Sequence, residues 1–284
     1  MEHRAGIRAH DIGHYSETEL PRRLAEQAVP YVQLTLDDAF GSRAPGAKEL
    51  NSGYAGRIRR AFDTQNVGIA VLSCYINPIH PDPSVRRAQL DKFCAYVRHA
   101  RDFGCSLVAT ETGSCMPDLS FSPANYGAKA MALLLESLYE MTDRAERYGV
   151  TVLMEGVHKF VAHSPDDIET ILHVVPSENL QVILDPVNLL CRAEEKTAMD
   201  LVEESFARYG DRIAALHAKD YIRTESGAIR QVPVGQGSLN WERIAALCAE
   251  YKPWLPVILE DSEPDRLQQE LSVLDTFFAA CGES

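Results

Sequence analysis

Short apolar runs alternate with longer segments of helical character along the whole chain, and this alternation limits the fold more than any other feature. Each run is nearly continuous, as in parallel strands that are covered on both faces, instead of alternating apolar and polar residues. We therefore expect eight buried strands with helices between most of them. The expected strands span residues 6–12, 31–36, 67–74, 106–111, 151–155, 182–185, 213–217 and 256–260.

Helix start and stop signals separate these runs. Residues that can accept hydrogen bonds from a first helical turn precede the expected helices, and a glycine follows one of them. The expected starts are Ser84, Ser122, Ser164, Asn240 and Ser262 or Glu263, and the first of these helices runs to Phe103 and is closed by Gly104.

The last four expected strands end at regular intervals. Glu155, Asp185, His217 and Glu260 follow one another at spacings of 30, 32 and 43 residues, each of which suits one strand, one helix and their loops. With 284 residues, the chain suits a single-domain (β/α)8 TIM barrel over residues 1–284. A doubly wound open sheet is the competitor, but it favours a glycine-rich turn after the first strand, and residues 7–11 contain no glycine.

Composition excludes several classes of partner. The net charge of −13 repels phosphate backbones, so we expect no nucleic-acid partner. We also expect no membrane partner, because no apolar run approaches the roughly 20 residues of a membrane span. The first four residues lack the apolar core of an export signal, and the seven cysteines form no CxxC pair, so we expect a reduced, cytoplasmic protein.

Four successive expected strands end on side chains that bind metal ions: Glu155, Asp185, His217 and Glu260. A buried strand should stay apolar until it emerges, and in barrels the carboxyl ends of the strands carry the catalytic groups. Each residue alone has an ordinary alternative, such as a capping residue, a turn residue or a hydrogen-bonded histidine at the rim. Their occurrence in consecutive strands favours a site for one divalent ion, Mn²⁺, Mg²⁺ or Co²⁺, with Zn²⁺ as a further option.

Several segments in the second half of the chain resemble one enzyme family. They are Glu155, Asp185, the stretch His-Ala-Lys-Asp at 217–220, the stretch Pro-Val-Gly-Gln-Gly at 233–237 followed by Trp241, and Glu260. In this order and spacing they resemble the sugar phosphate isomerase/epimerase family of xylose-isomerase-like TIM barrels, most strongly over residues 150–262. That superfamily includes ketose 3-epimerases, hydroxypyruvate isomerases, inosose and dehydroshikimate dehydratases, and apurinic-site endonucleases.

The resemblance implies roles for the four strand-end residues. In ketose 3-epimerases of this type, four such residues bind one divalent ion, and the two glutamates also move the substrate proton. Glu155 and Glu260 would then be ligands and catalytic acid/base groups, with Asp185 and His217 as ligands. The chemistry is coherent, because a cation on a carbonyl and its neighbouring hydroxyl stabilises an enediolate, and a carboxylate on each face can move the proton.

Two positions depart from the epimerase pattern. Val161 stands where the epimerases have a second glutamate, and Asn188 stands where they have a histidine three residues after the aspartate ligand. Asn188 can still hydrogen-bond a sugar hydroxyl. The related endonucleases use that histidine in a multi-metal cluster, so its absence argues against DNA cleavage, as does the net charge. The reaction within the family therefore stays open.

The remaining candidate residues are expected to contact substrate at the same end of the barrel. Arg223 matches an arginine that contacts a substrate oxygen in the epimerases, with a solvated loop arginine as the alternative. Lys219 either reaches a phosphate, a carboxylate or the developing enolate, or forms a salt bridge with Asp220. Glu111 ends the fourth expected strand and contacts either substrate or a basic neighbour. The further candidates for substrate binding are Asn188, His158, His10 and His80.

The expected function is that of a metal-dependent isomerase or epimerase. Its substrate would be a small carbohydrate, namely a sugar, a sugar phosphate or a hydroxy-keto acid, and the proton would move through an enediolate. A lyase of the dehydratase type is the first alternative, because it begins with the same proton abstraction and then expels a β-oxygen. A non-catalytic sugar-binding barrel is the second. The sequence does not determine the oligomeric state, and a homo-oligomer is one of the options.

Overall fold

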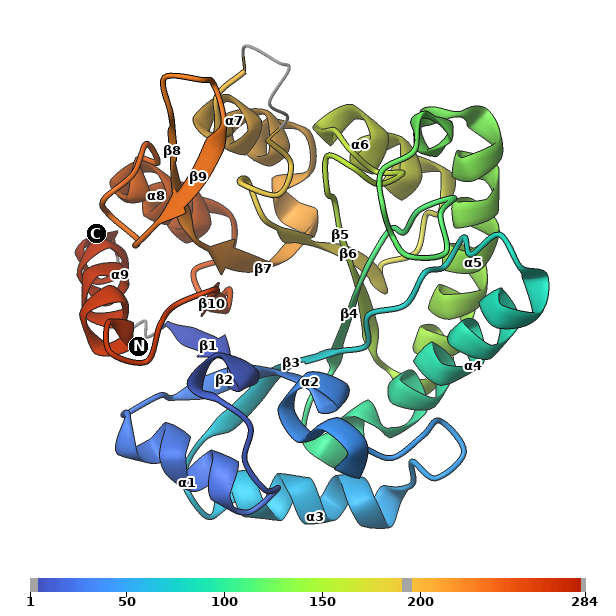
Figure 1. Ribbon diagram of the computed structural model, residues 1–284, viewed down its shortest axis with the longest axis horizontal. Helices are drawn as coiled ribbons and strands as arrows, with labels where there is room; N and C mark the ends of the chain where they lie inside the picture. The colour runs from blue at the N-terminus through green and yellow to red at the C-terminus, as the bar shows by residue number, and fades with distance from the viewer. Residues whose placement is uncertain (1–4, 191–195, 282–284) are drawn as a thin grey trace.

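The computed structural model describes residues 5–190 and 196–281, which form a closed barrel of eight parallel strands surrounded by helices (Figure 1). The strands lie around the barrel in the order β1-β10-β7-β6-β5-β4-β3-β2. Each strand therefore neighbours the one before it and the one after it in the chain, once the separate hairpin β8–β9 is left out. The expected (β/α)8 barrel is confirmed.

All eight expected strands are present, with small differences in their ends. β1 stops at Arg8, and residues Ala9–Ile12 form a 3₁₀ turn instead of continuing the strand. The turn brings Arg8 beside Asp11, three residues later, where the two side chains form an ion pair. The strands are β1 Gly6–Arg8, β2 Tyr31–Thr35, β3 Gly68–Ser73, β4 Leu107–Glu111, β5 Thr151–Glu155, β6 Leu180–Leu184, β7 Ile213–Ala218 and β10 Val257–Leu259.

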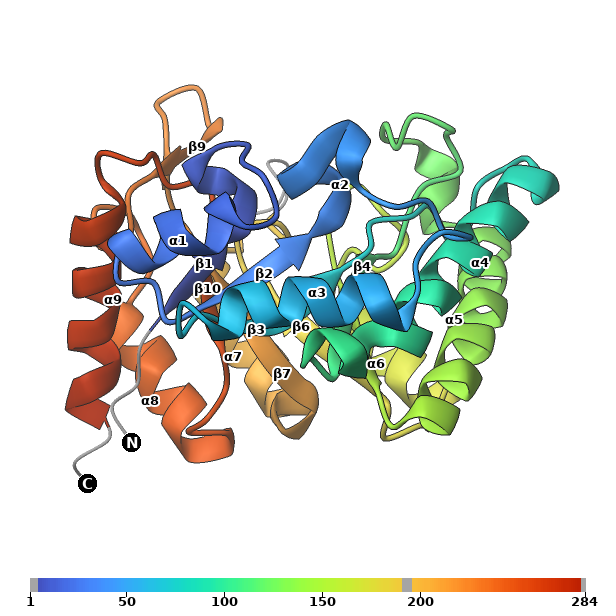
Figure 2. The ribbon, with the colours of Figure 1, turned by 90° about the horizontal axis from the view of Figure 1, so that it is seen from below.

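Helices cover the outside of the barrel, and Figure 2 shows α3 in front of the strands with α4 and α5 to its right. A large apolar core between strands and helices holds the two layers together. The helices are α1 Glu19–Glu26, α2 Leu36–Phe40, α3 Ser52–Asp63, α4 Pro83–His99, α5 Ala128–Tyr148, α6 Pro165–Val174, α7 Ala198–Tyr209, α8 Trp241–Tyr251 and α9 Leu267–Cys281.

Two of the expected helix starts are confirmed and the others are displaced. The side chains of Ser164 and Asn240 cap α6 and α8. Asp82, not Ser84, caps α4, because its carboxylate accepts from the first backbone N–H groups of the helix. Ser122 begins a short 3₁₀ turn that is separate from α5.

The first expected helix ends earlier than predicted, and the last one begins later. α4 itself ends at His99, and a 3₁₀ turn carries the chain on to Gly104, which adopts the left-handed conformation expected of a closing glycine (φ 82°). The last helix begins at Leu267, later than expected. The backbone N–H groups of Arg266 and Leu267 both bond to the Glu263 carbonyl, so residues 263–266 form a turn before the helix.

The interior of the barrel has two levels, because alternate residues of each strand point inward. The lower level is a cluster of buried apolar side chains: Val71, Ala109, Leu153, Ile183 and Ala215. The residue two positions later in each of these segments is polar or ionisable: Ser73, Glu111, Glu155, Asp185 and His217. A polar level at the carboxyl ends of the strands therefore lies directly above an apolar one.

An antiparallel hairpin of β8 (Asp220–Arg223) and β9 (Ile229–Val232) is inserted between β7 and α8, which the sequence did not predict. In Figure 2 it rises with α2 at the end of the barrel where the strands finish. Asp220 anchors its base and is fully buried. Its carboxylate accepts five N–H groups, from the backbone of Tyr221, Gly235, Gly237 and Leu239 and from the Trp241 indole.

The first strand and the last helix lie side by side, and the backbone N–H of Ala5 donates to Asp275 at 2.8 Å. Within the described ranges, no helix combines the length and apolar character that a membrane crossing requires. Among the cysteines whose side chains are described, Cys74, Cys94, Cys105 and Cys115 are free thiols, as expected. Cys191 and the side chain of Cys281 lie outside the described part of the chain.

Candidate metal centre

Four strand ends bring Glu155, Asp185, His217 and Glu260 to the polar level of the barrel. Glu155 is the last residue of β5, Asp185 directly follows β6, His217 lies in β7 and Glu260 directly follows β10. These side chains point inward because each lies two residues beyond an inward-facing apolar residue of its own strand. All four are nearly inaccessible, with exposed fractions of 3%, 1%, 1% and 5%.

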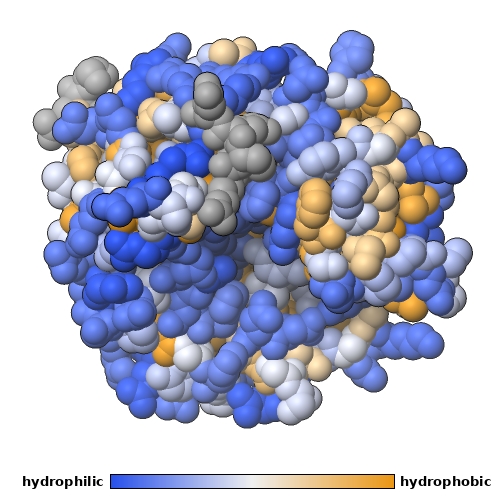
Figure 3. All heavy atoms as spheres, turned by 45° about the horizontal axis from the view of Figure 1, so that its top comes forward, coloured by the Kyte–Doolittle hydropathy of each residue, from blue (hydrophilic) through white to orange (hydrophobic). Residues whose placement is uncertain are grey.

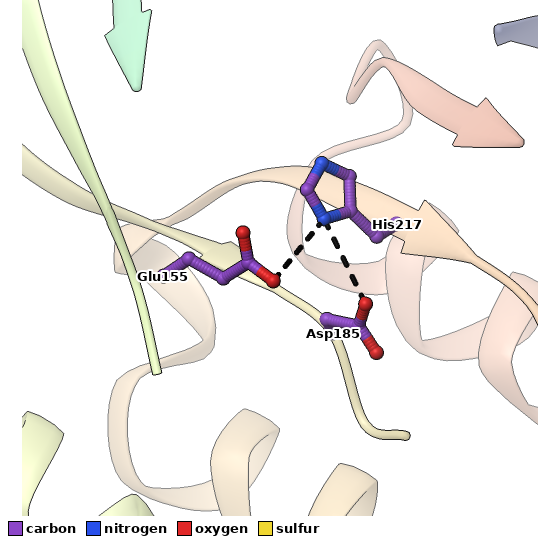
Figure 4. Close-up of side chains that lie close together, drawn as sticks. All are labelled: Glu155, Asp185 and His217. Atoms are coloured by element: carbon purple, nitrogen blue, oxygen red, sulfur yellow. Dashed lines mark ion pairs between the residues drawn. The ribbon is translucent and has the colours of Figure 1, made fainter. Parts of the chain in front are cut away.

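The Nδ1 atom of His217 lies at the centre of this cluster. It is 3.5 Å from Glu155 Oε1, 3.8 Å from Asp185 Oδ2 and 3.3 Å from Glu260 Oε1. Figure 4 shows Glu155 and Asp185 pointing toward the imidazole from two directions, Glu155 from the end of β5 and Asp185 from the segment directly after β6. Ligand atoms of Glu155, Asp185 and His217 all lie within 4.8 Å of one another, so this trio could hold one metal ion.

Two permanent cations lie against the three carboxylates. The Lys219 ammonium is 2.7 Å from Asp185 Oδ2 and 3.1 Å from Glu260 Oε2. The Arg8 guanidinium is 3.7 Å from Glu260 Oε1 and also pairs with Asp11 and Asp261. The three buried carboxylates therefore have Lys219, Arg8 and the His217 imidazole as their neighbouring basic groups.

The pKa values of the cluster reflect this charge. Burial opposes protonation of His217, but the Glu260 and Glu155 carboxylates outweigh it and raise the pKa of His217 to about 9. Burial also opposes ionisation of Glu260, but His217 and Lys219 outweigh it and lower the pKa of Glu260 to about 2. Burial raises the pKa of Asp185 to about 6, with Lys219 acting in the opposite direction.

Four of the expected substrate-binding residues lie at the cluster or beside it: Asn188, His158, Lys219 and Glu111. Asn188 donates to Glu155 Oε1 at 2.6 Å and accepts from Lys219 Nζ at 2.9 Å, so it links two members of the site. His158 is half-buried, and its Nδ1 lies 3.0 Å from the Asn188 carbonyl oxygen. Lys219 does not pair with Asp220, because the Asp220 oxygens accept the five N–H groups of the hairpin base.

Glu111 is the carboxylate of the neighbouring strand. It is in register with Glu155 in the β4–β5 pairing, so the two side chains leave the sheet on the same face. Burial and then the nearby Glu155 charge raise the pKa of Glu111 to about 8. Glu111 is thus a carboxyl group that keeps its proton at neutral pH beside the cluster.

The other expected substrate contacts make local interactions. The His80 ring accepts from the backbone N–H of Asp82, two residues later in its own loop. Arg223 lies on β8, and its guanidinium donates to the carbonyl oxygen of Lys196. His10 lies in the turn after β1, with its Nε2 3.7 Å from Asp11 Oδ1. Burial, followed by the Arg8 charge, lowers the pKa of His10.

Sequence reasoning missed three residues at this site: Arg8, Gln33 and Tyr75. Gln33 is fully buried on β2, and its Oε1 lies 2.8 Å from His217 Nε2. Its Nε2 donates to the Tyr75 hydroxyl at 2.9 Å. A charged or amide side chain within an apolar strand was the available signal for Arg8 and Gln33. Tyr75 gave no signal, because a tyrosine after a strand is ordinary.

The donor set fits a divalent cation. Within the described part of the chain, His217 Nδ1 is buried and has no hydrogen-bond partner, although it faces three carboxylates. Such an atom is costly unless something binds it. Carboxylate oxygens with one imidazole nitrogen suit Mg²⁺, Mn²⁺, Co²⁺ and Zn²⁺.

The surface in Figure 3 is mostly hydrophilic, with apolar side chains gathered at its right.

Comparisons with known proteins agree with this architecture. The model of the family described as xylose isomerase-like TIM barrel matches residues 21–277. No curated protein sequence matches the chain. Among solved structures, a xylose isomerase-like TIM barrel protein from Mycobacterium smegmatis in complex with magnesium is 18% identical, with a TM-score of 0.76 over 97% of this chain and 94% of that one.

Two further structures have the same fold. A D-tagatose 3-epimerase-like protein is 17% identical, with a TM-score of 0.75 over 99% of each chain. The probable 3-DHS dehydratase AsbF from Bacillus anthracis, involved in petrobactin synthesis, is 13% identical, with a TM-score of 0.71 over 96% of this chain and 98% of that one. At these identities the likeness concerns the fold.

Proposed function

Because this chain belongs to the family of xylose isomerase-like TIM barrels, we propose that it is a divalent-metal-dependent isomerase or epimerase. Its substrate would be a small sugar, a sugar phosphate or a hydroxy-keto acid. The observation that carries the proposal is the position of His217 Nδ1, buried and without a hydrogen bond in the described structure, among three carboxylates from three other strands. The epimerase-like structural neighbour supports the same class of reaction.

We assign Glu155, Asp185, His217 and Glu260 as the ligands. A divalent ion bound by them would supply Lewis-acid polarisation of a substrate carbonyl, which makes the adjacent carbon more acidic. Lys219 holds Asp185 and Glu260 in place, and Asn188 holds Glu155. These contacts keep the carboxylates oriented before any substrate arrives.

Glu155 and Glu260 carry the proton transfer in this proposal. They come from β5 and from the end of β10, which are separated in the barrel by β6 and β7, so they approach the centre from different directions. One carboxylate removes the proton from the carbon next to the carbonyl, giving an enediolate, and a carboxyl group returns a proton to the product. Glu111 places a further carboxyl group beside Glu155.

We propose that the substrate contacts the residues around this centre. Lys219 and Asn188 lie closest to the ligands. Asn188 keeps one amide N–H for a substrate oxygen, whereas Lys219 would exchange one of its contacts with Asp185, Glu260 and Asn188 for the substrate. We propose that outer parts of the substrate reach the remaining candidates: Glu111, His158, His10, His80 and Arg223.

A lyase of the dehydratase type is the second candidate. Val161, at the position of the second epimerase glutamate, is apolar and only 1% exposed, so it offers no acid or base there. The probable 3-DHS dehydratase among the structural neighbours, which has the same fold, supports this second candidate. Both reactions start with the same proton abstraction, and they differ in whether a β-oxygen then leaves.

The experiment is to incubate the protein with Mn²⁺ and a panel of ketoses, ketose phosphates and hydroxy-keto acids in D₂O. An isomerase or epimerase is expected to place deuterium on the carbon next to the carbonyl, as read by NMR, with no new ultraviolet absorbance. A conjugated double bond would identify the lyase instead. Metal-loaded protein that exchanges no proton on any member of the panel contradicts both.

His217→Ala is expected to weaken Mn²⁺ binding by more than the roughly 10- to 100-fold that loss of an outer-sphere partner costs, because it removes the one nitrogen ligand. Isothermal titration of the metal-free protein gives the dissociation constant, and thermal unfolding checks the fold. His99→Ala is the matched control, since His99 pairs with Asp102 on the outside of the barrel. Unchanged metal affinity in His217→Ala would remove His217 from the ligand set.

A further inference from the structure

The hydrogen bond between Gln33 and His217 lies behind the proposed metal centre, on the side of the imidazole away from the carboxylates. Gln33 belongs to β2, which is separated from β7 in the barrel by β1 and β10, and its side chain crosses the interior to reach His217. It is fully buried, so bulk water does not compete for His217 Nε2 in the structure. Gln33 is therefore the side chain that provides the hydrogen-bond partner of His217 Nε2.

The amide of Gln33 has a defined orientation. Its Nε2 donates to the Tyr75 hydroxyl at 2.9 Å, which leaves Oε1 facing His217 Nε2 at 2.8 Å. A carbonyl oxygen can only accept a hydrogen bond, so His217 must carry a proton on Nε2 in this arrangement. In the neutral imidazole that metal binding requires, this is the single ring proton, so Nδ1 would present its lone pair on the side of the three carboxylates.

Without Gln33 the opposite tautomer would be favoured. Oxygens of Glu260 and Glu155 lie 3.3 Å and 3.5 Å from Nδ1, and carboxylates attract a proton to the nitrogen that faces them. A proton on Nδ1 blocks that atom as a ligand. The acceptor at Nε2 and the acceptors at Nδ1 therefore compete for the same proton.

We propose that Gln33 is a positioning residue that holds His217 in the tautomer able to bind a metal ion through Nδ1, and that the hydrogen bond to Tyr75 holds the Gln33 side chain against His217. This inference rests on the proposed function, because it concerns one of its ligands. Outer-sphere partners of this kind are typically worth about 10- to 100-fold in metal affinity. Gln33 acts through His217 and has no contact with substrate in this proposal.

The test is titration of the metal-free full-length chain with MnCl₂ by calorimetry. Gln33→Met keeps the length of the side chain without its acceptor, and it is expected to bind Mn²⁺ about 10- to 100-fold more weakly than wild type. Gln33→Glu restores an acceptor and is expected to bind close to wild type. Tyr75→Phe, which removes the hydrogen bond that holds the Gln33 side chain, is expected to lie between them.

A matched control comes from β6. Gln181 is another strand glutamine, with its amide bonded to the Glu178 carbonyl and to Lys252. Gln181→Met is expected to leave Mn²⁺ affinity unchanged. A second readout is the His217 Nε2–H signal in ¹⁵N-histidine-labelled protein, which should exchange slowly in wild type and Gln33→Glu and lose its protection in Gln33→Met. A packing role alone would not move that signal.

Wild-type affinity in Gln33→Met, or equal weakening in Gln33→Glu and Gln33→Met, would overturn the inference while leaving the proposed function intact. A wild-type protein that binds no Mn²⁺ would overturn both. Should Gln33→Met fail to fold, Gln33→Glu decides alone, since tight binding with a protected Nε2–H supports the role and weak binding by folded protein refutes it.

Discussion

Replacing Glu155 or Glu260 by glutamine is expected to lower the turnover number by about 10²- to 10⁴-fold, the usual contribution of a positioned acid or base. Glutamine is nearly isosteric with glutamate and keeps one oxygen for Asn188 or Lys219, so the barrel should stay folded. It cannot accept a proton from a carbon acid. Both carboxylates are proposed ligands as well, so the rates are compared at saturating Mn²⁺, after a calorimetric titration of each variant.

The measurement is deuterium incorporation into the substrate that the panel identifies. Glu203→Gln serves as the control, because Glu203 pairs with Arg243 on the outer surface and lies on α7, away from the strand ends. Near-normal exchange in either site variant, once it is loaded with metal, would mean that its glutamate does not move the proton. The two glutamates are judged separately, since one could be a ligand only.

Asp220→Ala is expected to destabilise the protein by about 3–5 kcal/mol, the second large effect. The Asp220 carboxylate accepts five N–H groups and is completely buried, so its removal leaves several donors without partners. A Cβ atom on Gly237 would collide with Asp220 Oδ1, which indicates how closely the loop approaches the carboxylate. Gly235, one of the backbone donors to this carboxylate, adopts a positive φ of 80°, a conformation that favours glycine.

Denaturant unfolding of the metal-free protein checks this value. Asp143→Ala is the matched control, since Asp143 is 58% exposed and pairs with Arg147 one helical turn away, and such a pair is worth less than about 1 kcal/mol. Asp220→Asn should recover little, because its amide NH₂ would face N–H donors. A loss of no more than the control would show that water or a shifted loop satisfies the donors.

The barrel was predictable because its signals are local. Each strand is an apolar run of a few residues. Because a strand covered on both faces is apolar along its whole length, the run alone identifies it, without knowledge of the strands it pairs with. Glu155, Asp185, His217 and Glu260 were predictable as a group because parallel strands finish at the same end of the barrel, so residues at their ends must be neighbours. In this fold, a residue's place at the end of its strand is therefore enough to predict its spatial neighbours.

The features that sequence reasoning missed depend on contacts between distant residues. Gln33 and His217 are 184 positions apart, and nothing near Gln33 reveals that its side chain crosses the barrel. The hairpin was missed because β9 is polar and largely accessible, and its stability comes from Asp220. The cap of α4 was assigned to Ser84 instead of Asp82 because both residue types are common helix caps, and only the backbone geometry shows which of them precedes the first helical residue.

The packed aliphatic layer beneath the four ionisable side chains has a kinetic consequence. Val71, Ala109, Leu153, Ile183 and Ala215 seal the barrel axis from below. A small molecule that binds at the proposed ligands would therefore enter and leave at the carboxyl ends of the strands, on the other side of this layer. Reactant and product cannot occupy this site together, so inhibition by product should be competitive with respect to substrate.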